Sequence, residues 1–285
     1  MNETIAAAVV LYHPDKPALK HNVDSYLPHV SRLFIIDNTP GGSGLGDNLL
    51  YDRKVFYLAN KKNEGIADAL NKAAALAVNE KYRWLLTMDQ DSFFENGEME
   101  KFISFFRHQF MYDESTAIVA PSQEKTGDEI NLSFIVETAV ITSGNLLNLQ
   151  IWQKSGGFET KLFIDEVDHE YCYRVNNAGY KVIRFPTVYL NHSLGTKKEA
   201  GYAGIVSKSK RTIHSPRRVY FIVRNYLYVR KKFKTQLPAE FKKRDKMMLS
   251  ALKNNLLFSG QFFKTLKSIC KGFRDFKRNN FDTTL

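Results

Sequence analysis

Two aspartates separated by a single residue have the spacing in this sequence that most directly suggests chemistry. Asp89 and Asp91 stand in the segment LLTMDQDS (residues 85–92), where a short apolar run ends in two acids. Side chains at positions i and i+2 of an extended chain point to the same side, so both carboxylates can converge where a buried strand ends. Such a pair suits a hard divalent cation, Mg²⁺ or Mn²⁺, that keeps room for a phosphate ligand. The alternative is that both acids cap a turn or a helix.

A second acidic cluster lies in the segment DEVDHEYCYR (residues 165–174), which places four acids within six residues. If a helix begins between Asp165 and Asp168, its dipole favours acids in the first turn. Glu170 and Arg174 then form an i,i+4 pair. One interpretation makes a carboxylate of this cluster a general base that takes a proton from a hydroxyl nucleophile. The other is a solvated, well-capped helix start.

Alternating strands and helices position these acids. We expect buried strands at residues 5–12, 32–36, 54–58 and 82–88, and an alanine-rich helix at residues 66–78. This alternation predicts an α/β fold with a mostly parallel sheet flanked by helices, in which ligands bind beyond the carboxyl ends of the strands. Three polar groups fall at such ends: Tyr12-His13, Asp37-Asn38 and Asp89-Gln90-Asp91.

The rest of the chain predicts further elements and a tail. We expect a helix at residues 98–110, a strand at 117–120, an alternating segment at 134–142 that leads into Ser143-Gly144, a short helix at 146–155, a helix within 163–178 and a last strand at 180–185. The predicted domains are a catalytic domain over residues 1–235 and a basic helical tail over residues 236–285.

Composition restricts the class of protein. The 285 residues are 44% hydrophobic, which suffices for one large domain or a domain with an appendage. Cys172 and Cys270 make no disulfide framework, which indicates a reducing compartment. The apolar run at residues 5–12 is too short for a signal peptide, and no stretch of about 18 apolar residues predicts a transmembrane helix.

Positive charge is concentrated at the end of the chain. The net charge is +11, but residues 201–285 carry 21 Lys and Arg against 4 Asp and Glu, whereas residues 1–200 are net negative. An acidic body with a basic tail suggests an anionic partner, either a membrane or a nucleic acid. Against a nucleic-acid-binding protein, the sequence has no zinc pattern, helix-turn-helix or RNA-recognition signature.

An apolar stripe at helical spacing marks the last part of this tail. Its members are Phe262, Leu266, Ile269, Phe273 and Phe276, and six Lys and Arg lie around them. A cationic helix with large aromatic residues suits an anionic membrane interface. The alternatives are that the stripe docks on the domain or on a second copy, which would make a homodimer.

Taken together, these motifs resemble the family-2 inverting glycosyltransferases with the GT-A fold, and more narrowly the bacterial rhamnosyltransferases that use a dTDP-linked sugar. The resemblance covers roughly residues 6–230. It rests on the segments VVLYHP (residues 9–14), IIDN (35–38), NEGIA (63–67) with Ala69 and Asn71, LTMDQDS (86–92), TSG (142–144), FIDEVDHEYCYR (163–174) and HSLG (192–195).

The resemblance implies roles for the strand-end residues. Asp37 would read the pyrimidine base near Tyr12, and the donor site would also include Asn38, Asn63 and Gln90. Asp89 would bind the ribose or belong to the metal shell. Asp91 would ligate Mg²⁺ or Mn²⁺ on the diphosphate, and His192 matches a position that adds a metal or diphosphate contact in several relatives. For His192 the alternative is a histidine that caps a strand end.

The resemblance also implies a base and an acceptor side. Asp168 matches the base of the family's paired-acid motif, but Val167 stands where relatives more often have an acid. Asp165 or Glu166 is therefore a candidate to share the work. The residues expected to contact the acceptor or to support the site are Ser143, Gly144, Asp165, Glu170, Arg174 and Arg218.

The implied activity is metal-dependent, inverting transfer of L-rhamnose from dTDP-β-L-rhamnose to a hydroxyl of a lipid-linked cell-surface polysaccharide precursor. We expect a cytoplasmic enzyme that is peripheral on the inner face of a bacterial cell membrane. One alternative keeps the fold and uses a UDP-sugar, galactofuranose or N-acetylglucosamine. Another is a non-catalytic glycan-binding protein, against which both acidic clusters argue.

Overall fold

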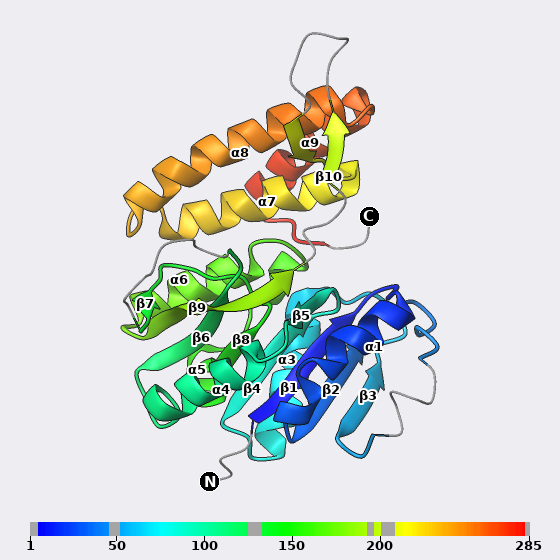
Figure 1. The fold of residues 1–285 in the computed structure, drawn as a ribbon. Helices are drawn as coiled ribbons and strands as arrows, with labels where there is room; N and C mark the ends of the chain where they lie inside the picture. Colours follow the sequence, from blue (N-terminus) through cyan, green and yellow to red (C-terminus); the bar gives the residue numbers. More distant parts are fainter. Residues whose placement is uncertain (1–4, 46–51, 125–132, 193–196, 201–208, 283–285) are drawn as a thin grey trace. The chain divides into compact units, whose positions relative to one another are not determined.

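The computed structural model describes residues 5–45, 52–124, 133–192, 197–200 and 209–282 (Figure 1). The chain divides into two compact units. The first, here the sheet unit, comprises Met1–Phe163 and Val167–Ser193. The second, here the helical unit, comprises Ile164–Glu166 and Leu194–Leu285. The boundary expected between residues 235 and 236 stays a prediction. Helix α7 (Pro216–Phe233), which precedes that boundary, belongs to the same unit as the helices that follow it.

One mixed sheet forms the centre of the sheet unit, with strand order β3-β2-β1-β4-β8-β6-β9-β5 and β7 beside β9. Strands β1 to β4 pair in parallel, and so do β6 and β9, whereas β8 runs antiparallel to β4 and β6. The strands are β1 (Ile5–Leu11), β2 (Arg32–Asp37), β3 (Val55–Ala59), β4 (Trp84–Asp89), β5 (Ser92–Phe94), β6 (Thr116–Ser122), β7 (Ile135–Val136), β8 (Asn145–Asn148) and β9 (Lys181–His192). The predicted α/β fold with a central sheet flanked by helices is confirmed, but the sheet is mixed where a mostly parallel one was expected, because β5 and β7 also pair antiparallel with β9.

Both faces of β1 are buried, which explains its uninterrupted apolar sequence. On one face, Val9 and Leu11 belong to a core that also contains Leu19 of α1 and Phe102 of α4. The other face packs against the alanine-rich helix α3, whose small side chains allow a close approach of helix and sheet. The helices of this unit are α1 (Lys16–Asp24), α3 (Ile66–Asn79), α4 (Glu98–Gln109), α5 (Leu149–Ser155) and α6 (Val167–Asn177).

Two predicted elements differ from the structure. The segment 146–155, expected as one short helix, begins as strand β8 and becomes helix α5 only at Leu149. Leu146 and Leu147 are buried between β4 and β6, and a short apolar run has no period that separates strand from helix. The expected last strand at 180–185 extends to His192 as β9, and β10 (Lys197–Ala200) and β11 (Ser209–Thr212) follow it.

The helical unit is built on α7, α8 (Pro238–Phe258) and α9 (Phe262–Lys277). Helix α9 packs against α7 at Gly272 and at Asp275, which accepts a hydrogen bond from the Tyr220 hydroxyl, and its third buried position, Thr265, contacts Ser259 after α8. At Gly272 a Cβ would lie 2.8 Å from the carbonyl oxygen of Tyr220, so only glycine permits this approach.

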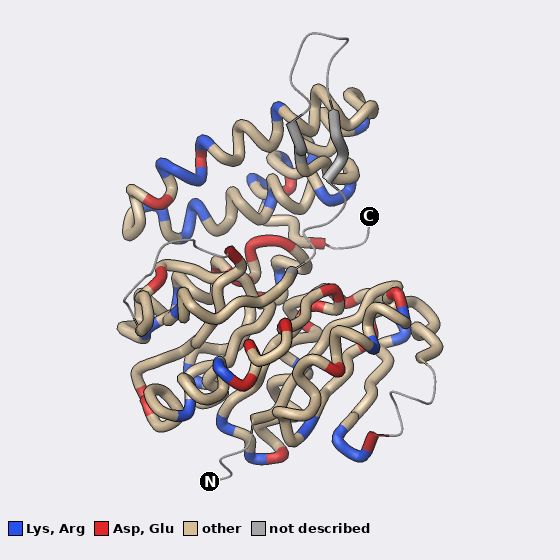
Figure 2. Tube along the Cα trace, in the orientation of Figure 1, with Lys and Arg blue, Asp and Glu red and all other residues tan. Residues whose placement is uncertain are grey.

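The predicted apolar stripe of α9 is not the face that packs against α7. Phe262, Leu266 and Phe273 are 46%, 39% and 45% exposed, and Phe263 beside them is 83% exposed. These side chains are therefore not packed against the other helices of their own unit. Lys and Arg occur along both α8 and α9, and Figure 2 shows those of α8 clearly.

The two cysteines are free and have different surroundings. Cys172 on α6 is buried, and burial raises its pKa to about 12. Cys270 on α9 is exposed. No helix among the described residues is both long enough and apolar enough to cross a bilayer.

Candidate active site

The polar ends of three parallel strands meet at one edge of the sheet, as expected. In the register, Leu11 of β1 lies opposite Asp37 of β2, and Val10 lies opposite Asp89 of β4. Tyr12, directly after β1, is 44% exposed and makes an edge-to-face contact with His13. An exposed aromatic ring beside carboxylates at strand ends suits a nucleotide, whose base can stack on the ring.

Asp37 is fully buried and fixes the loop that follows β2. Its carboxylate accepts hydrogen bonds from the backbone N–H groups of Thr39 (2.8 Å) and Ser43 (2.7 Å) and from the Tyr57 hydroxyl (2.6 Å). Burial raises the pKa of Asp37, but these hydrogen bonds outweigh it, so the pKa is lowered overall. The contacts that the structure gives Asp37 thus shape the loop that borders the expected base site.

Gln90 connects the end of β1 to the turn after β4. Its amide accepts from the Tyr12 N–H (2.8 Å) and donates to the Tyr12 carbonyl (3.2 Å), while Asn22 donates to the Gln90 carbonyl (2.9 Å). In this structure Gln90 therefore holds Tyr12 in place.

Asn38 and Asn63 stabilise the turn before α3. The Asn38 amide donates to the Gly65 carbonyl (3.0 Å) and accepts from Asn60 (2.8 Å), and the Asn63 side chain accepts from the Gly65 N–H (3.0 Å). Gly65 has φ +87°, and a Cβ there would lie 2.6 Å from Phe163. The segment NEGIA thus packs tightly against Phe163, two residues before the second acidic cluster.

Asp89 is the last residue of β4, and its N–H donates to the buried Ser143 hydroxyl (3.0 Å). Gly144, with φ +81°, donates to the Thr87 carbonyl and leaves no room for a Cβ beside Leu190. Ser143 and Gly144 therefore support the strand that carries the two aspartates. The backbone of His192 pairs with Ser92, next to Asp91, while residues 193–195 of the HSLG motif lie outside the described residues.

Oxygen ligands from Asp89 and Asp91 fit a hard divalent cation. Among the described residues, no group of three or more His, Cys, Asp and Glu could hold a metal. Mg²⁺ is usually bound by only one or two carboxylates together with substrate phosphates and water, so a pair at the end of a strand is sufficient. This chemistry agrees with the donor set, and the metal itself stays a prediction.

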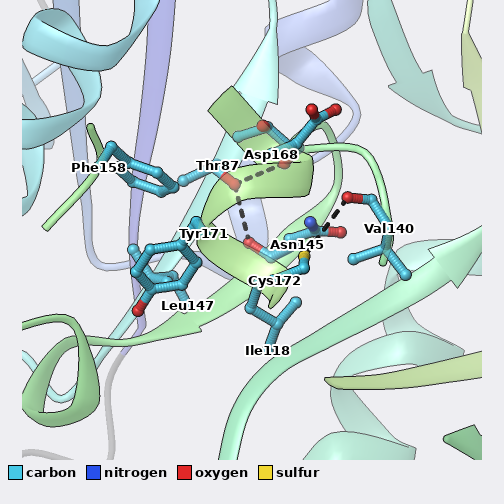
Figure 3. Close-up of a pocket in the computed structure, with 10 residues that line it drawn as sticks. Thr87, Ile118, Val140, Asn145, Leu147, Phe158, Asp168, Tyr171 and Cys172 are labelled. Carbon is cyan, nitrogen blue, oxygen red and sulfur yellow. Dashed lines mark hydrogen bonds between the residues drawn. The ribbon is translucent and has the colours of Figure 1, made fainter. Parts of the chain in front are cut away.

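Asp168 stands in the first turn of α6, where the helix dipole favours a carboxylate. Its side chain is 21% exposed, and its Oδ1 lies 3.0 Å from His169 Nδ1. Asp168 lines a narrow pocket of about 10 Å³ together with Thr87, Asn145 and Cys172 (Figure 3). Thr87 precedes Asp89 by two residues on β4, so the pocket that Asp168 lines adjoins the strand that ends in Asp89.

Glu170 and Arg174 form the predicted i,i+4 pair with two hydrogen bonds of 2.9 Å. Glu170 is fully buried, and Arg174 also donates to the carbonyls of Ser155 and Gly157. Burial lowers the pKa of Arg174, but the hydrogen bonds to Glu170 raise it more, so the guanidinium keeps its charge. The pair therefore anchors α6 to the turn after α5 and has a supporting role in the structure.

Asp165 and Arg218 belong to the helical unit, where they form an ion pair of 3.1 Å. Glu166 pairs with Arg244 (2.5 Å) in the same unit. Burial raises the pKa of Asp165 more than Arg218 and His214 lower it. Asp165 and Glu166, which were alternative candidates for the general base, are thus each paired with an arginine.

Several contacts of the residues described above have no local signal in the sequence. Tyr57 reaches Asp37 only because β3 pairs with β2 in the observed register, and Thr87 and Asn145 face each other only because β8 inserts beside β4. Arg244 lies 78 residues from Glu166. Such contacts follow from topology, which the pattern of strands alone does not specify.

Residues 32–172 match the family described as "Glycosyl transferase family 2". The chain is 27% identical over 252 residues to the dTDP-rhamnosyl transferase RfbF of Shigella flexneri, and the alignment covers 81% of each protein. Its fold is similar to that of GalNAc-T7 solved with UDP, GalNAc and Mn²⁺ (TM-score 0.58, 12% identity, 96% of this chain) and of TarS from S. aureus (TM-score 0.50, 11% identity, 68% of this chain). The chain spans 56% and 37% of the lengths of these two solved chains.

Proposed function

We propose that this chain is a family-2 glycosyltransferase with a GT-A fold that transfers L-rhamnose from dTDP-β-L-rhamnose to an acceptor hydroxyl. The observation that supports dTDP-rhamnose as the donor is the similarity to a dTDP-rhamnosyl transferase over 81% of both chains. The acceptor in this proposal is a hydroxyl of a lipid-linked precursor of a cell-surface polysaccharide.

The donor side of the proposed site is the edge where β1, β2 and β4 end. Tyr12 offers a ring for the base, and Asp37, Asn38 and Asn63 form the loops around it. Asp89 and Asp91, with His192 as a further candidate, would hold Mg²⁺ or Mn²⁺. When bound, such a cation neutralises the charge that develops on the diphosphate as it leaves.

Asp168 is the proposed general base. An acceptor hydroxyl oxygen forms a bond to the anomeric carbon while the bond from that carbon to the diphosphate oxygen breaks, and dTDP leaves with the electron pair. The hydroxyl proton passes to the Asp168 carboxylate. One base on one side and a diphosphate leaving group on the other give a single displacement with inversion, without a carboxylate nucleophile.

A thermal-shift panel of dTDP, UDP, GDP and ADP, each with and without Mn²⁺, tests the donor. Binding to the folded state raises Tm by mass action, so we expect the largest metal-dependent rise with dTDP. Transfer from dTDP-rhamnose then follows in the same buffer. A rise with UDP alone would contradict the rhamnose donor and support a UDP-sugar, galactofuranose or N-acetylglucosamine. No rise with any nucleotide would contradict the donor site.

The proposal includes a peripheral position on the inner face of a bacterial cell membrane. Helices α8 and α9 carry ten Lys and Arg against three Asp and Glu. Two of these acids are paired within the unit, Asp245 with Arg230 and Asp275 with Tyr220. The exposed aromatic face of α9 adjoins these positive charges, a combination that suits an anionic lipid surface.

A second copy of the chain is the other candidate for the exposed face of α9. Two copies meeting through this surface would bring two strongly cationic helices together, which like-charge repulsion opposes. The charge pattern therefore favours the membrane over a homodimer.

A further inference from the structure

The turn before α6 has an unusual backbone. Phe163, Asp165 and Glu166 all have positive φ values, of 52°, 61° and 68°. Residues with side chains rarely adopt this conformation, and three in four consecutive positions need surroundings that enforce it. Strained backbone of this kind is concentrated at functional sites, where it fixes the direction of a neighbouring group.

Three side chains of the helical unit enforce the conformation of this turn. Arg218 pairs with Asp165, and Arg244 pairs with Glu166, with both members of the second pair about one tenth exposed. The buried Asn225 amide donates to the carbonyls of Ile164 (2.6 Å) and Asp165 (3.3 Å). The turn is thus held by charge on its side chains and by hydrogen bonds on its backbone.

The two pairs are not optimal for stability alone. Asp165 and Glu166 each keep one buried carboxylate oxygen without a hydrogen-bond partner among the described residues. A buried oxygen without a partner is unfavourable, so these contacts fix the conformation of the turn at a cost in stability.

We propose that Arg218, Asn225 and Arg244 are positioning residues that set the start of α6 and thereby the location of Asp168. Helix α6 begins at Val167, directly after the turn, and Asp168 is its second residue. A displacement of about 1 Å of a catalytic group can cost on the order of 10²-fold in rate. The proposal rests on the proposed function, in which Asp168 is the base, and it makes Asp165 and Glu166 partners of arginines and not bases.

Two variants and a matched control test this proposal in the full chain. Arg244→Gln removes a buried partner of the turn, and Arg218→Gln removes a half-exposed one, which leaves a second test if the first variant does not fold. Arg230→Gln is the control, because Arg230 forms a comparable ion pair with Asp245 in the same unit without touching the turn.

We expect both variants to lower kcat about 10-fold to 100-fold with little change in donor KM, and Arg244→Lys to recover part of the loss. Hydrogen exchange should become faster in residues 163–168 of both variants. The control should change neither. Equal exchange and equal kcat in the variants and the control would overturn the proposal.

The pH profile separates positioning from direct catalysis. If Asp165 were the base, loss of the Arg218 charge would raise its pKa, and the acid limb of kcat would move to higher pH in Arg218→Gln. We expect the limb to stay in place while kcat falls at every pH, and a moved limb would overturn the proposal. If the wild-type chain transfers no sugar, the proposed function fails, while the exchange measurement still decides whether these residues hold the turn.

Discussion

In the proposed site, some residues bind the donor and the metal, and one residue, Asp168, takes the proton of the acceptor hydroxyl. The spacing of Asp89 and Asp91 suggested a metal site, whereas Asp168 was singled out among the four acids of its segment only by the resemblance to the family's paired-acid motif. The supporting residues around them were not identified in the same way, because their roles depend on strands that pair across the sheet. Single substitutions can therefore distinguish a residue that binds the donor from a residue that is needed for turnover.

Asp168→Asn should keep metal-dependent donor binding and lose turnover. The amide cannot accept the hydroxyl proton, and a general base contributes about 10²-fold to 10⁴-fold. Thermal shift with dTDP and Mn²⁺ measures binding, and single-turnover transfer measures the reaction. The control is Glu100→Gln, an exposed carboxylate on α4. Transfer at the wild-type rate would remove Asp168 from the role of base.

Asp91→Asn should weaken donor binding only when the metal is present. An amide oxygen is a poorer ligand for Mg²⁺ or Mn²⁺ than a carboxylate. Titration of dTDP with and without Mn²⁺ measures the difference, and we expect the metal-dependent part of the affinity to fall about tenfold or more. If the metal dependence is the same in both proteins, Asp91 is not a ligand.

Asp37→Asn should lower stability in a way that depends on pH. The hydrogen bonds lower the pKa of Asp37 in the folded state, so its stabilising effect is present above the unfolded pKa of about 3.9 and is lost as pH falls through the folded value. We expect the variant to be less stable by about 1.5–3 kcal/mol at pH 7 and the difference to shrink toward pH 3. Urea unfolding at both pH values measures this, and a constant difference would contradict it.

Helices and strands were predictable where the sequence has a long helical repeat of apolar residues or an uninterrupted apolar run. The strands β1, β2 and β4 and the helices α3 and α4 agree with the sequence, because each shows an uninterrupted apolar run or a helical repeat. Strand β8 was missed because four residues between two other strands have no period of their own. The packing face of α9 was missed because helix packing here uses a glycine and polar residues, while periodicity identifies apolar ones.

Gly272→Ala tests the packing of α9 against α7. The added methyl group would overlap the Tyr220 carbonyl oxygen and approach Val223, so the helices must separate. We expect a loss of about 1–3 kcal/mol in chemical denaturation. Cys270→Ala, on the exposed side of the same helix, is the matched control and should be neutral. Equal stability of the two variants would show that the contact is not restrictive.

At the scale of the whole molecule, charge and exposed apolar surface are distributed unevenly. Residues 201–285 hold about half of all Lys and Arg but few acids. Seven of the eleven large hydrophobic side chains exposed among the described residues lie between positions 247 and 273. This asymmetry was visible in the sequence as a count of charges, whereas the exposure of the aromatic face required the structure.

The full chain should bind vesicles that contain anionic lipid and not neutral ones. Apolar insertion and charge act together, so Phe263→Ser combined with Phe273→Ser should weaken binding about tenfold or more. Salt near 1 M should also release the chain, because it reduces the screening length to about 3 Å. Co-sedimentation measures both effects, with Tyr112→Ser as an exposed aromatic control in the sheet unit. A dimer in light scattering without vesicle binding would instead assign the aromatic face to a second copy.

Because one cysteine is buried and the other is exposed, a thiol-reactive label can be attached to a single position of this chain without any substitution. Cys172 is buried and its thiol stays protonated at pH 8, so a thiol-reactive fluorophore will attach to the exposed Cys270. Cys270 is seven residues from both Phe263 and Lys277, two helical turns in each direction, and so shares one line of α9 with an aromatic ring and a cation. A polarity-sensitive dye at this thiol would therefore change its emission when lipid covers that line of the helix, and the native sequence would serve as its own sensor.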